Sequence, residues 1–207
     1  MLIQLLFSSP TEYLMVVVSV LVALSVHEYS HAQMASFLGD RTAEDLGRLT
    51  VNPLRHLDPF GTFFLLVVGI GWGKPVPFNP FNIKNQRWGP ALIGLAGPAS
   101  NFLMALLVGL SLRFFTLSNP ALVAFFIIFV WLNIILGVFN LLPIPPLDGS
   151  HILFSIYPPS FDKIRYFLQG SFFLVIFAIF FMMYIGIPYI CGPLFTLITG
   201  IPLPFLL

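Results

Sequence analysis

Two histidines and a glutamate lie close together in an apolar stretch near the N-terminus, where the sequence reads SVHEYSHAQ. His27 and His31 are four residues apart, so on a helix both side chains lie on one face and can hold the same metal ion. Glu28 directly follows the first histidine, and from this position a carboxylate reaches metal-bound water rather than the metal. The spacing is the HExxH pattern of zinc metalloproteases. The alternative interpretation is a pair of interior histidines that are hydrogen-bonded to neighbouring helices, with Glu28 paired to one of them.

A catalytic zinc site usually has three protein ligands and one open position, so HEYSH leaves one ligand to be found. Asp148 follows an apolar stretch in FNLLPIPPLDGSH, where prolines and Gly149 break the helix and allow the carboxylate to turn back into the bundle. Alone, this Asp-Gly pair would indicate a turn at a membrane surface, but beside HEYSH we favour a metal ligand. The other carboxylates considered are Glu12, Asp40, Glu44, Asp45, Asp58 and Asp162. His56 and His151 lie outside the HExxH spacing, and we expect them in loops or at the membrane interface.

The composition indicates which elements must position these groups. The chain has 207 residues, of which 58% are hydrophobic and 8% charged, whereas soluble domains carry about 25% charged residues. Such a chain belongs in a bilayer, and a nucleic-acid binder, a disordered tail and a solvated coiled coil are excluded. The single cysteine, Cys191, excludes a disulfide framework and a cysteine-cluster metal site.

The sequence predicts an all-α polytopic membrane protein with about four full transmembrane helices. One further apolar stretch, residues 60–71, is too short to cross and predicts a re-entrant or short membrane segment. The proline-rich stretch from Trp72 to Pro80 predicts a short extended segment near the active site. We expect one membrane-embedded domain over residues 1–207, with a core at 13–165 and an extra C-terminal span and tail at 166–207, of which 193–207 lie along the interface. The four predicted spans are residues 13–38, 89–112, 121–142 and 166–190.

Basic residues predict the orientation, because Lys and Arg in short loops are retained on the cytoplasmic side. With the N-terminus extracytoplasmic and residues 60–71 returning to their own side, only Arg113 lies outside. Asp148 then faces the cytoplasm. The predicted cytoplasmic set is Arg41, Arg48, Arg55, Lys74, Lys84, Arg87, Lys163 and Arg165.

The sequence resembles the site-2 proteases, a family of intramembrane zinc metalloproteases. The resemblance rests on HEYSH at 27–31, on NLLPIPPLDG at 140–149, which matches the family's Asn-x-x-Pro-x-x-x-x-Asp-Gly signature, and on AGPASN at 96–101. The stretch from His56 to Pro80 is also similar to the family's compact members, so the likeness covers residues 13–165. No PDZ or CBS segment is present in the sequence. The resemblance implies one zinc ion per chain bound by His27, His31 and Asp148, water activation by Glu28, a substrate contact at Asn140, and a cytoplasm-facing active site.

The expected activity is hydrolysis of peptide bonds in or near transmembrane segments of membrane-protein substrates. A transmembrane helix shields its peptide bonds with its own hydrogen bonds, so it must unwind and find new partners. In the extended segment, Pro75 and Pro77 have no backbone N–H and cannot donate a backbone hydrogen bond. Val76 keeps its N–H and is predicted to bind the substrate by strand addition. The alternative function is a non-catalytic membrane protein that binds or transports metal, which has no need of a general base at Glu28. A membrane zincin with a glutamate as third ligand is excluded, because no glutamate follows Glu44.

Overall fold

The computed structural model describes residues 2–69, 71–156, 168 and 171–202, and in these ranges the chain is predominantly helical. Four helical stretches are long and apolar enough to span a membrane, namely Pro10–Phe37, Gly89–Phe114, Pro120–Asn140 and Phe173–Thr199. The predicted all-α polytopic fold is therefore confirmed. The helices are α1 (Leu2–Ser8), α2 (Pro10–Phe37), α3 (Thr42–Asp45), α4 (Pro59–Val68), α5 (Gly89–Phe114), α6 (Pro120–Asn140), α7 (Gly149–Ile156), α9 (Phe172–Phe181), the π-helical η4 (Met182–Cys191) and α10 (Gly192–Thr199), with 3-10 turns η1 (Pro53–Arg55) and η2 (Pro80–Asn82).

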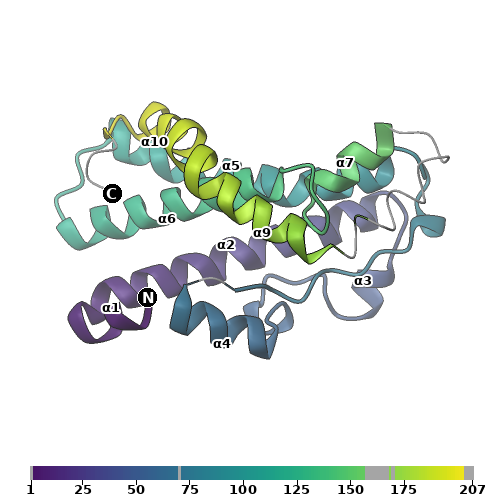
Figure 1. Cartoon of the computed structure of the whole chain (residues 1–207), viewed down its shortest axis with the longest axis horizontal. Helices are drawn as coiled ribbons and strands as arrows, with labels where there is room; N and C mark the ends of the chain where they lie inside the picture. The colour runs from purple at the N-terminus through teal and green to yellow at the C-terminus, as the bar shows by residue number, and fades with distance from the viewer. Residues whose placement is uncertain (1, 70, 157–167, 169–170, 203–207) are drawn as a thin grey trace.

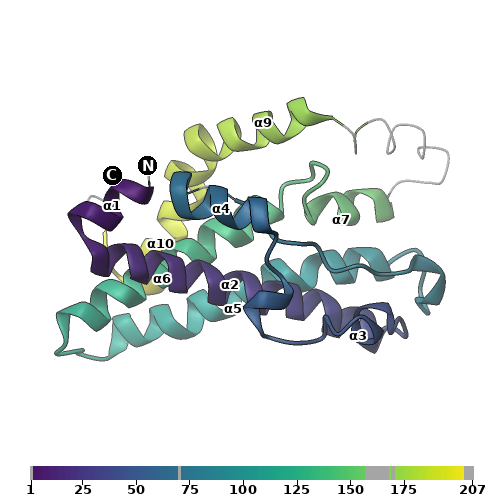
Figure 2. The same cartoon turned by 90° about the horizontal axis from the view of Figure 1, so that it is seen from below.

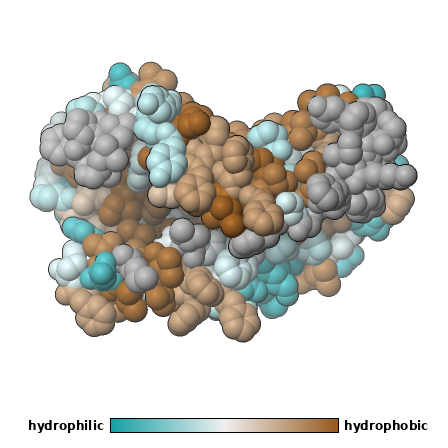
Figure 3. Space-filling view, in the orientation of Figure 1, coloured by the Kyte–Doolittle hydropathy of each residue, from teal (hydrophilic) through white to brown (hydrophobic). Residues whose placement is uncertain are grey.

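Helices α2, α5 and α6 pack against one another and form the centre of the molecule (Figure 1). Small residues let them approach closely: Ala105 of α5 is fully buried, and a side chain at Gly137 of α6 would press against the Phe102 ring of α5. Helix α1 packs against α2 and α4, so the short helices cover one flank of α2 (Figure 2). Apolar residues cover most of the middle of the face seen in Figure 3, as expected for lipid contact.

Helix α4 has ten residues and is therefore about 15 Å long, half of the hydrocarbon thickness. Its start is fixed by Asp58, whose side chain accepts a hydrogen bond from the Gly61 N–H at 2.8 Å. Its end is fixed by Gly69, which adopts a left-handed backbone conformation with φ of 97°. The predicted short membrane segment at 60–71 is thus a short helix followed by a glycine stop.

The chain from Trp72 to Asn79 has no helical residue, which confirms the predicted extended segment. One isolated antiparallel bridge joins Gly73 to Leu57, and the Lys74 N–H donates to the His56 carbonyl at 2.7 Å. Prolines at 75 and 77 prevent the segment from forming a helix. The described residues contain no longer strand ladder.

The last span ends later than the sequence predicted. Residues 193–199, expected along the interface, are helical in α10 and belong to the span Phe173–Thr199. Pro193 does not end the helix: it lies at the start of α10, directly after the π-helical η4, where the backbone hydrogen-bond pattern changes. Gly200, at φ of 73°, ends the helix. Of the predicted span 166–190, residues 166, 167, 169 and 170 lie outside the described residues.

Candidate metal centre

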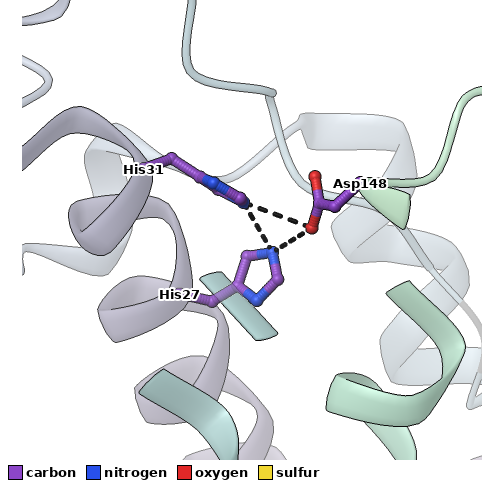
Figure 4. A group of neighbouring side chains, drawn as sticks. All are labelled: His27, His31 and Asp148. Atoms are coloured by element: carbon purple, nitrogen blue, oxygen red, sulfur yellow. Dashed lines mark hydrogen bonds and ion pairs between the residues drawn. The ribbon is translucent and has the colours of Figure 1, made fainter. Parts of the chain in front are cut away.

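Two separate elements bring the metal-ligand candidates together. Helix α2 presents His27 and His31 one turn apart, and the turn between α6 and α7 presents Asp148 toward them (Figure 4). The turn folds back onto the end of α6. It lies so close there that a side chain on Gly149 would collide with the backbone of Leu141. Only glycine allows this close approach, so the Asp-Gly pair at 148–149 places the carboxylate beside the histidines.

The three ligand atoms converge to hydrogen-bond distance. His27 Nε2 lies 3.0 Å from His31 Nε2 and 3.1 Å from Asp148 Oδ2, and His31 Nε2 lies 3.3 Å from Asp148 Oδ2. Zinc bonds of about 2.0–2.1 Å in a tetrahedral site separate neighbouring ligand atoms by about 3.3 Å. Both histidines are buried, with 3% and 7% of their surfaces exposed. The donor set and its spacing therefore fit a zinc ion.

The outer nitrogens of the two rings are occupied by hydrogen bonds. His31 Nδ1 lies 2.6 Å from the Ile93 carbonyl, which can only accept, so this nitrogen carries the hydrogen. His27 Nδ1 lies 2.6 Å from Asn101 Oδ1. Each Nε2 is thereby left with a lone pair for a metal. Space for an ion is preserved by Gly97 of α5, where a side chain would collide with His31 Nε2.

A cavity of about 420 Å³ opens beside these ligands. His27, Glu28, Asn140 and Asp148 line it together with residues of α4 and of the extended segment. The Val76 N–H donates to Glu28 Oε2 at 3.1 Å, so the extended segment lies directly against the general-base candidate. Asn140 donates through Nδ2 to the Leu136 carbonyl at 3.0 Å, and its Oδ1 is a hydrogen-bond acceptor. All six site residues chosen from the sequence thus lie at or beside one cavity.

Arg48 is a residue of the site that sequence reasoning did not single out. Its side chain is buried and donates to the carbonyls of Lys74 and Pro75, which immediately precede Val76. Burial lowers the pKa of the Arg48 guanidinium, and attraction to Glu28 opposes this shift. The arginine therefore ties the extended segment down close to Glu28. No spacing rule connects residues 28, 48 and 76, which explains why the sequence alone did not reveal it.

The remaining histidines take no part in the ligand cluster of the described residues. His56 is buried in the loop before α4, and its Nε2 is hydrogen-bonded to the Thr50 carbonyl at 2.7 Å. His151 lies on α7 with its ring against Phe78. His56 thus lies in a loop, as predicted, whereas His151 lies on a helix.

Comparisons with known proteins show similarity to metalloproteases. A sequence model of peptidase family M50 matches residues 115–183. The "Putative zinc metalloprotease YwhC" of Bacillus subtilis is 42% identical over 151 residues, which cover 69% of this chain and 69% of that protein. The "Putative zinc metalloprotease Rip2" of Mycolicibacterium smegmatis is 36% identical over 146 residues, or 66% of this chain and 55% of that protein. Its namesake in Mycobacterium tuberculosis is 33% identical over 144 residues, with the same two coverages. No solved structure matches this chain. The chain therefore belongs to the site-2 protease family of metalloproteases, peptidase family M50.

Proposed function

We propose that this chain is an intramembrane zinc metalloprotease that cleaves peptide bonds within or near transmembrane segments of membrane proteins. The observation that carries the proposal is the convergence of His27, His31 and Asp148 on one point, with Glu28 beside them in a cavity among apolar helices. A protein that only binds or passes metal does not require a carboxylate at the position of Glu28.

His27, His31 and Asp148 would hold one zinc ion, which activates a water molecule and polarises the scissile carbonyl. Glu28 then acts as general base and general acid: its carboxylate takes the proton of the attacking water and delivers it to the leaving amine. The Val76 N–H supports this role by holding Glu28 Oε2, which leaves Oε1 to receive the proton. Helices α2, α4 and α6 around the cavity limit the access of bulk water.

The substrate is proposed to be a transmembrane helix that unwinds in the cavity. Its exposed N–H and C=O groups need partners there, because the hydrocarbon provides none. The extended segment around Val76 supplies backbone groups, and Asn140 supplies an amide on the opposite wall formed by α6. Both residues line or border the same cavity as the metal ligands, which supports their assignment as substrate contacts.

The active site is proposed to face the cytoplasm. The basic residues from Arg41 to Arg87 all belong to the connection between the C-terminal end of α2 and the start of α5, and α3, within this connection, lies at the same end of the bundle as α7 (Figure 1). Arg113 lies in the last turn of α5, where it donates to the Leu197 carbonyl of α10. The positive-inside rule then places Asp148 on the cytoplasmic side.

The decisive experiment compares Glu28→Gln with His27→Ala and Asp148→Ala in purified, detergent-solubilised protein. The parent is expected to contain about one zinc per chain, and the two ligand variants are expected to lose most of it. Glu28→Gln should retain zinc but lose proteolysis of a model transmembrane substrate by about 100-fold or more. Full proteolysis by Glu28→Gln would refute the protease assignment, and zinc retained by both ligand variants would refute the metal site.

A further inference from the structure

Two asparagines connect a metal ligand to the backbone of a neighbouring helix. His27 Nδ1 lies 2.6 Å from Asn101 Oδ1, Asn101 Nδ2 lies 3.0 Å from Asn133 Oδ1, and Asn133 Nδ2 lies 2.9 Å from the Phe129 carbonyl. Asn101 and Asn133 are fully buried, in α5 and α6 respectively. The chain of hydrogen bonds thus crosses three helices and ends on the ring of His27.

The direction of every hydrogen bond in this chain is determined by backbone carbonyls. The Phe129 carbonyl can only accept, so the Asn133 atom facing it is Nδ2 and the atom facing Asn101 is Oδ1. Asn101 also contacts the Ala23 carbonyl, at 3.3 Å, with the same nitrogen that contacts Asn133. Its Oδ1 therefore faces His27 and requires a hydrogen on Nδ1 of that ring.

We propose that Asn101 and Asn133 are positioning residues that hold His27 with its hydrogen on Nδ1 and its Nε2 lone pair directed at the metal. The proposal rests on the metal site assigned above and adds two residues that do not bind the metal. Asn101 acts directly on the ring, and Asn133 acts only through Asn101. We call the hydrogen bonds from Asn133 through Asn101 to His27 the relay. His31 needs no relay, because the Ile93 backbone carbonyl already holds its Nδ1.

Asn101 and Asn133 can be buried in an apolar bundle because their amide groups are paired by hydrogen bonds. An unpaired amide in such surroundings costs on the order of 1–3 kcal/mol, whereas here both amide ends of Asn101 and Asn133 have partners. If Asn133 were apolar, the Asn101 nitrogen would lose the shorter of its two contacts and keep only the one to the Ala23 carbonyl at 3.3 Å. The amide could then rotate and present Nδ2 to His27, which would favour a hydrogen on the nitrogen needed for the metal.

The test measures zinc affinity by chelator competition in four purified full-length proteins: the parent, Asn101→Leu, Asn133→Leu and the double variant. Outer partners of metal ligands typically change affinity by 10–100-fold, and we expect a loss of about 10-fold or more in each single variant. Because Asn133 acts through Asn101, the double variant should bind zinc no more weakly than Asn101→Leu. Independent structural effects would instead add, which would overturn the relay.

Rescue and a spectroscopic signal separate positioning from packing. Asn133→Gln and Asn101→Gln keep both the amide oxygen that accepts and the amide nitrogen that donates, so both should bind zinc more tightly than the corresponding leucine variants. The cobalt-substituted leucine variants should show a shifted visible absorption spectrum, because the His27 ligand is reoriented. If folded Asn133→Leu has the same zinc affinity and the same cobalt spectrum as the parent, Asn133 only fills space and does not position His27.

Two controls keep the outcome unambiguous. Ser25→Ala removes another buried polar group of α2, bonded only to the Leu21 carbonyl of its own helix, and should leave zinc affinity unchanged. If Asn133→Leu does not fold, Asn133→Ala is compared with Asn133→Gln in the same way. A parent that binds no zinc would contradict the proposed function, whereas a zinc-binding parent with unaffected asparagine variants would contradict the relay alone.

Discussion

Gly97 leaves open the space that the two histidines of the metal centre need. The rings of His27 and His31 lie against α5 at Gly97, and the absence of a side chain there keeps the region beside His31 Nε2 clear. The second glycine of the site, Gly149, allows the turn that carries Asp148 to fold back onto α6. Both glycines serve close approach, and neither has a positive φ.

We expect Gly97→Ala to abolish zinc binding or weaken it by at least about 100-fold, since the added carbon occupies the position next to the ligand nitrogen. Zinc content after dialysis and chelator competition measures this loss. Ala99→Val, on the exposed side of the same helix, is the matched control and should retain zinc. Equal zinc content in Gly97→Ala and the parent would contradict the placement of α5 against the metal ligands.

The backbone N–H of Val76 is the donor of the extended segment that reaches the catalytic carboxylate. We expect Val76→Pro, which removes this donor, to lower cleavage of a transmembrane substrate by about 10-fold or more while zinc content stays unchanged. Val76→Ala keeps the N–H and serves as the control, with near-parental cleavage. Parental cleavage by Val76→Pro would show that neither the position of Glu28 nor the binding of substrate needs this N–H, and Asn140 would be the next substrate contact to test.

The elements around the site are tied together by Asp40, which directly follows α2. Its carboxylate accepts hydrogen bonds from the Thr42 N–H and hydroxyl, from the Asn79 N–H at 2.6 Å and from Asn82 Nδ2 at 3.0 Å. Burial alone would raise the pKa of Asp40, but the bonds from Thr42, Asn79 and Asn82 outweigh it, and the pKa lies below the ordinary value. Asp40 thus fixes the far end of the extended segment to the helix that carries the metal ligands.

We expect Asp40→Asn to lower the free energy of unfolding by about 2 kcal/mol at pH 7, because its amide nitrogen would face the Asn79 N–H. A lowered folded-state pKa stabilises the protein above the unfolded pKa of about 3.9, and this contribution is lost as pH falls through the folded pKa. The difference between parent and variant should therefore shrink below about pH 4. Denaturation in detergent micelles from pH 7 to pH 2 measures it.

Glu44→Gln is the control for this acid dependence, since Glu44 is paired with Arg41 on the surface. An exposed pair of this kind contributes little, so Glu44→Gln should unfold like the parent at every pH. A stability difference for Asp40→Asn that stays constant down to pH 2 would show that the ionised carboxylate is not the stabilising group.

The two ends of the molecule differ in their number of basic residues. The loops next to α3 and the loop leading into α5 carry most of the basic residues, while the turn between α5 and α6 at residues 115–119 carries none. The retention of Lys and Arg in the cytoplasm predicts opposite sides for these two regions.

We expect Gln86→Cys to react with a membrane-impermeant thiol reagent only from the cytoplasmic face, and Ser118→Cys only from the opposite face. Both positions are exposed, whereas the native Cys191 is fully buried and should contribute little background. Right-side-out and inside-out vesicles distinguish the two faces. Labelling of both cysteines from the same side would contradict the number of crossings between them, and a complete reversal would contradict the proposed orientation.

The amino-acid sequence alone determined what depends on neighbours along the chain. Helical periodicity places His27 and His31 on one face, uninterrupted hydropathy marks the spans, and prolines at 75 and 77 exclude a helix. Each of these features depends only on residues that are near one another along the chain, so the sequence alone is enough to predict it. Asp148 was found because its Pro- and Gly-rich surroundings stop a span, which is again a local signal.

Only the tertiary structure decided which groups meet across the bundle. The Asn101 contact to His27 joins residues 74 positions apart, and the Val76 contact to Glu28 joins residues 48 positions apart. Arg48 and Asn133 have no spacing signal toward the metal ligands, because the packing of α2 against α5, α6 and the extended segment brings them there. The sequence also missed the late end of the last span, because the helix continues past Pro193 and stops only at Gly200.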